Sequence, residues 1–155
     1  MNPEGKQIVF NGKAYSYDHL ILATGSGSTY FGHEDWRTFA PPMKILEHAE
    51  EIRRRLLMAM EQAEQTPNPE ARQFLQTVVI VGGGPTGCEM AGAVSELMRW
   101  ALNSAFKQLD SQKTRIVLVD PGDRVLRAMP EELSKVAQKT LERNGVEFIP
   151  QGRVQ

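Results

Sequence analysis

The feature that most constrains the fold is a glycine-rich stretch, residues 77–91. It begins with four β-favouring residues, VVIV at 78–81, which is typical of a strand buried on both faces of a parallel sheet. Glycines then follow at Gly82, Gly84 and Gly87, the spacing G-x-G-x-x-G, and the pattern becomes helical after them. The order strand, glycine turn, helix favours a dinucleotide-binding unit over a plain strand-to-helix turn.

Each glycine in this motif has a predicted physical role. Gly82 allows the chain to reverse sharply where the strand ends, and Gly84 lets a pyrophosphate approach the backbone. Gly87 lets the helix pack tightly against the strand. Pro85 suits the first helical position, which needs no N–H group. The unpaired N–H groups and the positive dipole end of the helix are then expected to face the phosphates.

A second buried strand is predicted at residues 115–120, and it ends in Asp120. In this kind of fold a carboxylate there accepts hydrogen bonds from the adenosine ribose hydroxyls. Its distance in sequence from Gly82 exceeds the usual spacing of about 20 residues, because the helix and the loop after it are long. A carboxylate repels a 2′-phosphate, so Asp120 favours NAD(H) over NADP(H), although Arg124 could soften that preference. The alternative is an ordinary strand-end aspartate that caps its turn.

The rest of the chain predicts an α/β fold, a Rossmann-like domain with a partial parallel sheet and a short N-terminal β segment. Asn11-Gly12 predicts a hairpin over residues 7–17, and a strand is expected at 19–23. Helices are expected at about 44–64 and, after a cap at Asn68, at 69–75. The helix that begins at the glycine motif is expected to run to about 109, with a break near 103–104. A last helix is expected from 130 to Asn144-Gly145, followed by a strand at 146–149. In the last helix Leu133, Val136, Ala137 and Leu141 are expected to face the core.

Composition excludes several classes of function. The 155 residues carry a net charge of −1, which argues against binding nucleic acid through phosphate contacts. The single cysteine, Cys88, excludes an internal disulfide and a cysteine-based zinc cluster, so a reducing, cytoplasmic setting is expected. Cys88 is interpreted as a small buried residue rather than a nucleophile. The three histidines have no metal-ligand spacing, and no metal site is predicted.

A basic triplet, residues 53–55, lies within the first long helix. It could bind an anionic partner, but Glu47, Glu50 and Glu51 lie about one turn away. Local ion pairing on a solvated face is therefore the favoured interpretation.

Two stretches resemble signatures of one family. Residues 82–92, GGGPTGCEMAG, resemble the NAD-binding motif of the two-dinucleotide-fold flavoproteins, the pyridine-nucleotide-disulfide oxidoreductase superfamily. Residues 17–26, YDHLILATGS, are similar to that family's second signature, which ends the first segment of its FAD domain. The long helix and residues 119–126, VDPGDRVL, are most similar to type II NADH dehydrogenases, FAD enzymes that oxidise NADH and reduce a membrane quinone.

The resemblance implies which residues bind cofactor. NADH would be held by Gly82, Gly83, Gly84, Pro85, Thr86, Gly87, Glu89 and Asp120. Glu89 would lie at the nicotinamide end, although an acid in the first turn of a helix is favourable without any further role. Thr24 and Gly25 would lie near the FAD, whose own binding site is expected outside this chain. No catalytic residue is expected within it.

The resemblance also implies a domain organisation, with residues 1–28 as an edge segment of an FAD-binding domain and 29–155 as an incomplete NAD(H)-binding domain. Such a piece is expected to be inactive alone, and could form a homodimer through its exposed sheet edge. The intact protein would be cytoplasmic or peripheral on a membrane. Other electron acceptors (ferredoxin, sulfide or a disulfide) and a non-enzymatic NAD(H)-sensing module stay open. A methyltransferase shares the glycine turn, but the Ala-Thr-Gly signature argues against it.

Overall fold

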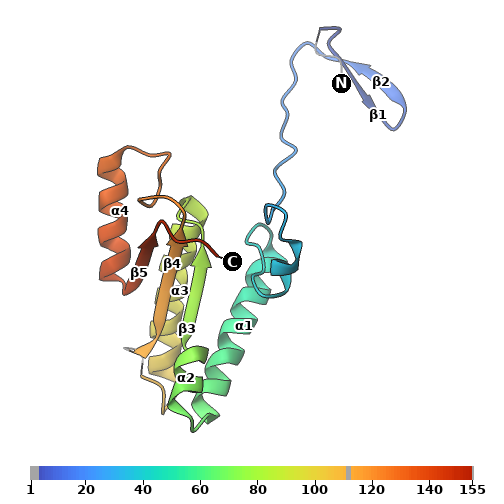
Figure 1. Cartoon of the computed structure of the whole chain (residues 1–155). Coiled ribbons are helices and arrows are strands. Elements are labelled where there is room, and N and C mark those ends of the chain that lie inside the picture. The colour runs from blue at the N-terminus through green and yellow to red at the C-terminus, as the bar shows by residue number, and fades with distance from the viewer. Residues whose placement is uncertain (1–3, 111–112, 155) are drawn as a thin grey trace. The chain divides into compact units, whose positions relative to one another are not determined.

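The computed structural model describes residues 4–110 and 113–154, and for residues 102–104 it describes the backbone alone. The chain divides into two compact units, Met1–Glu34 and Asp35–Gln155. Figure 1 labels the helices and strands of both units.

The first unit contains a β-hairpin. Strands β1 (Gln7–Phe10) and β2 (Lys13–Ser16) pair antiparallel. The two turn residues, Asn11 and Gly12, have φ values of 50° and 75°. A tight two-residue hairpin turn of this hand needs positive φ at both positions, which asparagine and glycine adopt readily. The predicted hairpin is confirmed.

The prediction of a strand at residues 19–23 is wrong. The segment is irregular, and the side chains of Ile21 and Leu22 are 89% and 63% exposed. Its apolar composition indicated burial against a sheet, but a strand also needs a neighbour that accepts and donates its backbone hydrogen bonds. No strand in the described part of the chain pairs with this segment.

Helices open the second unit. After a short 3-10 helix, η1 (Glu34–Thr38), the chain forms α1 (Leu46–Gln65) and α2 (Pro69–Leu75). The Asn68 side chain caps α2, since its Oδ1 accepts from the N–H groups of Glu70 at 2.9 Å and Ala71 at 3.2 Å. Both predicted helices and the predicted cap are confirmed.

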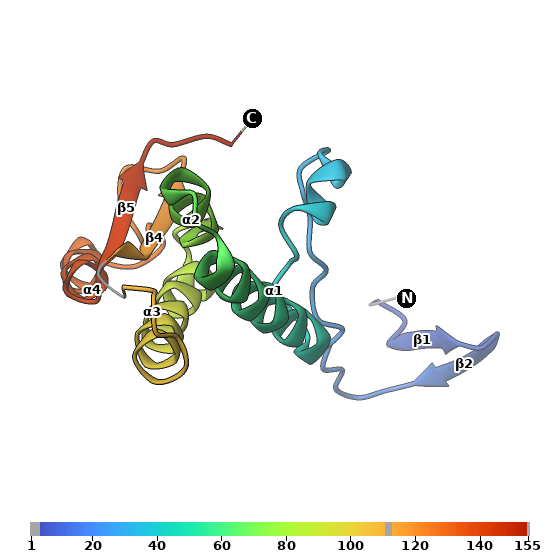
Figure 2. The same cartoon turned by 90° about the horizontal axis from the view of Figure 1, so that it is seen from below.

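The centre of the second unit is a parallel sheet of three strands in the order β3-β4-β5. These are β3 (Thr77–Val81), β4 (Arg115–Asp120) and β5 (Val146–Pro150). The crossovers contain α3 (Pro85–Ala105) and α4 (Glu131–Arg143), which lie on the same side of the sheet in Figures 1 and 2. The predicted α/β class with a parallel sheet is confirmed.

The hydrophobic core lies between one face of this sheet and the helices. Alternate residues along each strand point into it, as the two-residue period of a strand requires, and Leu118 at the centre is fully buried. The core members are Met60 and Ala63 from α1, Ala91, Val94 and Met98 from α3, Leu109, Ile116, Leu118, Val125, Leu141 and Val146. Burial of each larger side chain stabilises the fold by about 1.5–3 kcal/mol.

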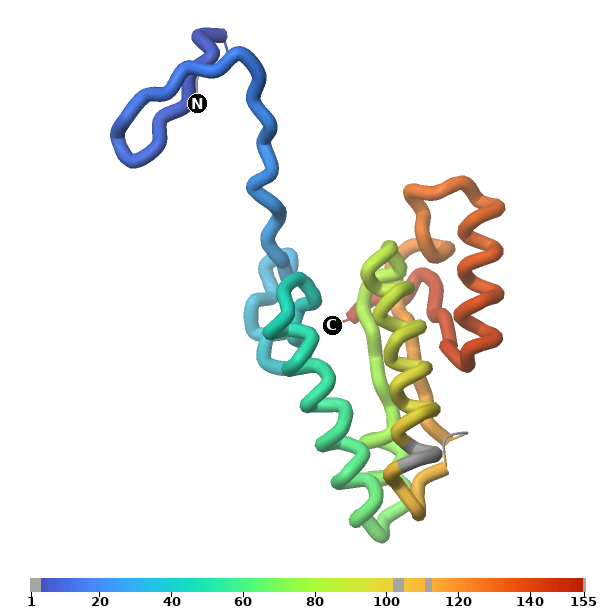
Figure 3. Tube along the Cα trace, turned by 180° about the vertical axis from the view of Figure 1, so that it is seen from behind, coloured from blue at the N-terminus to red at the C-terminus, as the bar shows by residue number. Residues whose placement is uncertain are grey.

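Helix α3 differs from its predicted extent. It runs without a break to Ala105 and ends there, earlier than the predicted residue 109. The end is fixed by α1, because the Glu64 carboxylate accepts from the N–H groups of Lys107 at 3.0 Å and Gln108 at 3.0 and 3.1 Å. The chain thus leaves the helix to meet a side chain 43 residues earlier, which local sequence pattern does not reveal. Figure 3 shows both helices from behind.

The buried face of α4 also differs from prediction. Leu141 is buried as predicted, but Leu133 and Val136 are 55% and 60% exposed. Ser134 is buried in their place, because its hydroxyl donates to the Val125 carbonyl oxygen at 2.5 Å. The helix ends at Asn144 followed by Gly145 with φ of 79°, as predicted.

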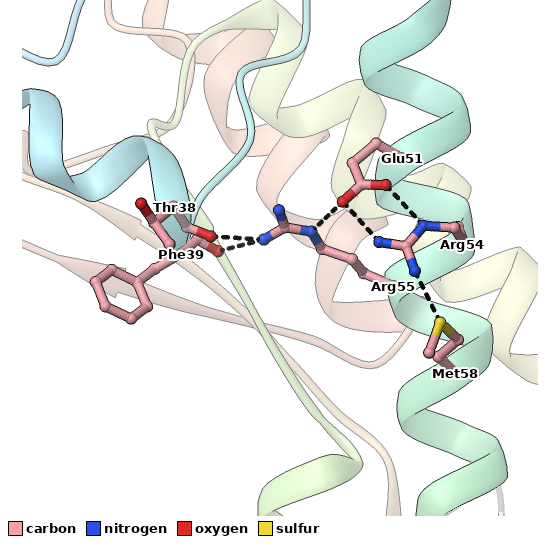
Figure 4. Close-up of polar contacts among 6 residues, drawn as sticks. All are labelled: Thr38, Phe39, Glu51, Arg54, Arg55 and Met58. Carbon is pink, nitrogen blue, oxygen red and sulfur yellow. Dashed lines mark hydrogen bonds and ion pairs between the residues drawn. The ribbon is translucent and has the colours of Figure 1, made fainter.

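The basic triplet on α1 forms local ion pairs (Figure 4). The Glu51 carboxylate accepts from Arg54 at 2.8 and 2.9 Å and from Arg55 at 2.6 Å. Arg55 also donates to the backbone oxygens of Thr38 and Phe39, at 2.8 and 3.5 Å, and so ties α1 to the end of η1. These hydrogen bonds, from Arg54 first and then Arg55, lower the pKa of Glu51 to about 2. The favoured interpretation of the triplet is confirmed for these two arginines.

Candidate functional site

The glycine loop lies at the carboxyl end of β3. Gly82 has a φ of 108°, in the region that residues with a side chain rarely adopt. Its N–H donates to the Val119 carbonyl oxygen at 2.8 Å, which extends the ladder between β3 and β4 by one bond. The chain then turns away from the sheet into α3. Gly82 therefore makes the sharp reversal that was predicted for it.

Gly87 allows α3 to approach the end of β3. A Cβ atom added at Gly87 would lie 1.7 Å from the Gly82 carbonyl oxygen and 3.5 Å from Leu118 Cδ1. Any larger residue would displace the start of the helix from the sheet. The structure thus has the close helix-to-strand contact predicted at Gly87.

The N-terminus of α3 faces open space. Gly84 is the N-cap and Pro85 the first helical residue, and the first helical bond runs from the Cys88 N–H to the Gly84 oxygen at 3.0 Å. The N–H groups of Thr86 and Gly87, in the first turn, have no acceptor within the helix. A Cβ atom added at Gly84 would meet nothing within 4 Å. This arrangement provides donors and room for an anionic group such as a pyrophosphate.

Asp120 lies directly beside the glycine loop. Its Oδ2 accepts from the Gly83 N–H at 2.6 Å, and its Oδ1 accepts from the Gly122 N–H at 2.6 Å. A carboxylate has about four lone-pair sites, so these two bonds leave acceptor capacity for two ribose hydroxyls. We refer to the glycine loop (residues 82–87) together with Asp120 as the cradle. Sequence reasoning predicted both parts of the cradle but not the bond between them.

The cations near Asp120 are directed toward their own loop. The Arg124 guanidinium donates to the carbonyl oxygens of Met129 at 3.2 Å and Arg127 at 3.1 Å. Arg127 lies 3.6 Å from Asp123 in an exposed ion pair. Arg124 was the residue expected to soften a preference for NAD(H), and in this structure its hydrogen bonds hold it on the backbone of residues 127–129.

Two side chains on α3 flank the cradle. Glu89 is exposed near the start of the helix. The Cys88 thiol lies 3.5 Å from the Gly83 carbonyl oxygen. Burial raises the pKa of Cys88 above its usual value, and the charges of Asp120 and Glu89 raise it further. A thiol whose ionisation is opposed in this way is a poor nucleophile, which agrees with its interpretation as a packing residue.

The other predicted site residues, Thr24 and Gly25, belong to the first unit. Both are exposed in an irregular segment, and Gly25 has a φ of 73°. These two residues belong to the first unit and the cradle belongs to the second, so their place near a flavin stays a prediction.

Other features of the described residues do not form a second site. None of their histidine, cysteine, aspartate and glutamate side chains gather in threes as a metal ion would need. A surface hollow of about 680 Å³ is lined by residues 67–70, between α1 and α2, away from the cradle. It presents two prolines, an asparagine that caps α2 and one glutamate, which offer little to recognise a ligand. No helix among the described residues is long and apolar enough to cross a bilayer.

Comparison with protein families decides the identity of this fold. The family model described as pyridine nucleotide-disulphide oxidoreductase matches residues 2–155. The chain belongs to the pyridine nucleotide-disulphide oxidoreductase family. The superfamily resemblance found in the glycine motif and in residues 17–26 is thereby confirmed.

Relatives in this oxidoreductase family share much of the chain. It is 46% identical over 132 residues to the type II NADH:quinone oxidoreductase Ndh of Mycobacterium tuberculosis, covering 85% of this chain and 28% of that protein. It is 31% identical over 134 residues to external NADH-ubiquinone oxidoreductase 2, mitochondrial, of Saccharomyces cerevisiae, covering 86% and 24%. The chain therefore spans under a third of the length of these relatives.

A solved structure supports the fold. The structure described as NDH2 from Plasmodium falciparum in complex with NADH superimposes with a TM-score of 0.74 and 22% identity. The match covers 89% of this chain and 28% of that chain. At this identity the likeness supports the fold alone.

Proposed function

We propose that the chain is the NADH-binding part of an FAD-dependent NADH dehydrogenase that passes hydride from NADH to flavin and electrons on to a quinone. The observation that carries this proposal is the cradle, in which a carboxylate with spare acceptor capacity lies beside a glycine loop at the carboxyl ends of β3 and β4. Ligands of open parallel sheets bind at that edge. The cradle lies in a chain 46% identical to a type II NADH:quinone oxidoreductase, which favours quinone over the other acceptors.

The residues of the cradle fit the parts of NADH. The first-turn N–H groups of α3 would bind the pyrophosphate over Gly84, and Asp120 would accept from the adenosine ribose hydroxyls. Glu89 would lie toward the nicotinamide end. NADH supplies a hydride from its nicotinamide ring, and the contribution of this chain is to bind and orient that ring.

The domain assignment extends to the first unit. We infer that residues 1–28 belong to an edge of the FAD domain in the whole protein, with Thr24 and Gly25 near the flavin, and that residues 29–155 belong to the NAD(H) domain. FAD itself would be bound outside this chain, and the whole protein would act at a membrane surface as a peripheral enzyme. The chain alone is expected to bind NADH weakly, show no flavin absorbance and have no dehydrogenase activity.

Titration calorimetry of the chain with NADH, NADPH and S-adenosylmethionine tests this proposal. We expect binding in the order NADH, then NADPH, with no binding of S-adenosylmethionine. A preference for S-adenosylmethionine would replace the proposal with a methyltransferase.

A matched pair of glycine variants tests the position of the pyrophosphate. Gly84→Ala adds a methyl group that meets nothing in the nucleotide-free chain, but it would occupy the space assigned to the pyrophosphate. Gly92→Ala also adds a methyl group into open space, farther along the same helix. We expect Gly84→Ala to keep its thermal midpoint within a few degrees and lose NADH binding, while Gly92→Ala keeps both. Unchanged NADH affinity in Gly84→Ala would show that the nucleotide lies elsewhere.

A further inference from the structure

We propose that Asp120 is a positioning residue for the glycine loop, in addition to the ribose contact proposed above. The inference rests on the proposed function in taking NADH as the ligand. Its content is that pyrophosphate binding depends on a side chain that does not touch the pyrophosphate. The bonds that carry it are Asp120 Oδ2 to the Gly83 N–H and Asp120 Oδ1 to the Gly122 N–H, which we call the carboxylate clamp.

The clamp joins two separate loops. Gly83 belongs to the turn between β3 and α3, and Gly122 to the turn after β4. Both glycines are buried, and both hydrogen bonds measure 2.6 Å. Hydrogen bonds to an ionised acceptor are short and about twice as strong as neutral ones. One side chain therefore holds the glycine loop and the turn after β4 together.

The space around the clamp is matched to glycine. A Cβ atom at Gly83 would lie 3.2 Å from Asp120 Cβ and 3.3 Å from its Oδ2. A Cβ atom at Gly122 would lie 2.7 Å from Asp120 Oδ1 and closer still to Cδ of the Arg127 side chain. The carboxylate thus packs against both backbones as well as bonding to them, so a side chain at Gly122 would force a shift and one at Gly83 would crowd the carboxylate.

The carbonyl group of Gly83 is hydrogen-bonded as well. Its carbonyl oxygen accepts from the Leu126 N–H at 2.7 Å and from the Cys88 thiol at 3.5 Å. The Leu126 backbone has a φ of 51°, an uncommon value for leucine, and this conformation directs its N–H to Gly83. With both its N–H and its C=O group hydrogen-bonded, Gly83 sets the direction in which the next residues, Gly84 to Gly87, enter α3.

The clamp requires a carboxylate. Both groups that face it are N–H donors, so both oxygens must be acceptors. An asparagine presents one oxygen and one NH₂ group, and its NH₂ group would face a buried donor. Asp120→Asn is therefore expected to release one loop, although it has almost the same shape. The two roles of Asp120, positioning and ribose contact, can be tested separately, because the ribose hydroxyls can be removed from the ligand without changing the clamp.

Nuclear magnetic resonance of the nucleotide-free chain tests the clamp directly. In Asp120→Asn we expect the amide proton of Gly83 or Gly122 to move upfield and exchange faster, while signals from α4 stay in place. The matched control is Asp123→Asn, which removes the same charge from the turn just after β4, where Asp123 forms an exposed ion pair at 3.6 Å. Unchanged Gly83 and Gly122 signals in Asp120→Asn overturn the proposal.

Binding of an NADH analogue without the two adenosine ribose hydroxyls tests the consequence. If Asp120 only binds ribose, Asp120→Asn leaves the affinity for this 2′,3′-dideoxy analogue unchanged, which overturns the proposal and leaves the proposed function intact. We expect instead a loss of about tenfold, the weight of a hydrogen bond to a charged group, and no loss in Asp123→Asn. If wild type binds neither NADH nor the analogue, the proposed function fails, and the resonance measurement still decides whether the clamp exists.

Discussion

Asp120 combines two demands that are usually met by different residues. It accepts hydrogen bonds from two buried backbone N–H groups, and the proposed function also requires it to leave lone pairs for a sugar. A carboxylate at the end of a central strand meets both, since each of its oxygens can accept two bonds. The local chemistry of the cradle therefore depends strongly on this one side chain.

Cofactor preference follows from the same charge. Asp120→Ala removes the group that repels a 2′-phosphate, so we expect the ratio of NADH to NADPH affinity to fall by about tenfold, even where both affinities drop. Parallel calorimetric titrations of wild type and variant with both nucleotides measure the ratio. A ratio that stays constant would contradict the assignment of Asp120 to the ribose.

Cys88 is a natural reporter of the cradle, because it is the only cysteine in the chain. Its raised pKa predicts slow alkylation at neutral pH, increasing as the pH rises through a value above 9. A bound pyrophosphate should slow the reaction further, because it adds negative charge and covers the helix start. Alkylation followed by mass spectrometry, with and without NADH, measures both effects. Equal rates with saturating NADH would place the nucleotide away from Cys88.

Helix α1 is stabilised at its start by a charge cluster rather than by a cap. Its N-cap residue, Ile45, has no side-chain hydrogen bond to the helix. Glu51 instead bonds two arginines, of which Arg55 reaches back to Thr38 and Phe39. This cluster is exposed, so solvent and salt are expected to reduce its contribution.

The pH dependence of this cluster has a definite sign. The pKa of Glu51 is lowered from 4.5 to about 2, so the folded state gains stability that is complete above pH 4.5 and is lost as the pH falls toward 2. We expect Glu51→Gln to lower the thermal midpoint slightly at pH 6 and to flatten its decline between pH 4.5 and 2. Glu50→Gln, which removes the neighbouring charge, is the control. If both variants follow the wild-type curve at low salt, the cluster does not stabilise the fold.

Helices, strands and turns whose own residues determine their conformation were predictable from the sequence. The hairpin follows from Asn11-Gly12, the start of α2 from Asn68-Pro69, and the sheet from three apolar runs separated by helices. The exceptions depend on partners distant in sequence. Ser134 is buried because its hydroxyl donates a hydrogen bond to the Val125 carbonyl oxygen. Residues 19–23 lack a pairing strand among the described residues. Helix α3 ends early because the Glu64 carboxylate caps the chain beyond it.

Within the described residues, β3 and β5 are the edge strands of the sheet of the second unit, since each pairs only with β4 and has no partner strand on its other side. Val79 on β3 is 56% exposed. Such edges can pair with another copy, so we propose that the chain forms a homodimer through the edge of β3.

A pair of lysine variants tests this dimer by sedimentation velocity over a range of concentrations. Val79→Lys places a charge beside the β3 edge and is expected to leave a monomer. Leu133→Lys changes a side chain of nearly equal exposure, 55%, on α4 and is expected to dimerise like wild type. A monomeric wild type, or equal effects of both variants, would rule out association through this edge.

The register of the parallel sheet has a consequence for how the chain folds. The Gly83 and Asp120 groups that form the clamp are 37 residues apart, and they meet only after β3 and β4 have aligned. Contacts of this range require the closure of a long loop and form slowly compared with helices. A slip of two residues would keep the same side chains inside but move the carboxylate by about 7 Å, out of reach of the glycine loop. The clamp thus distinguishes the correct strand alignment from its nearest competitor, and the cradle forms only in chains that have found it.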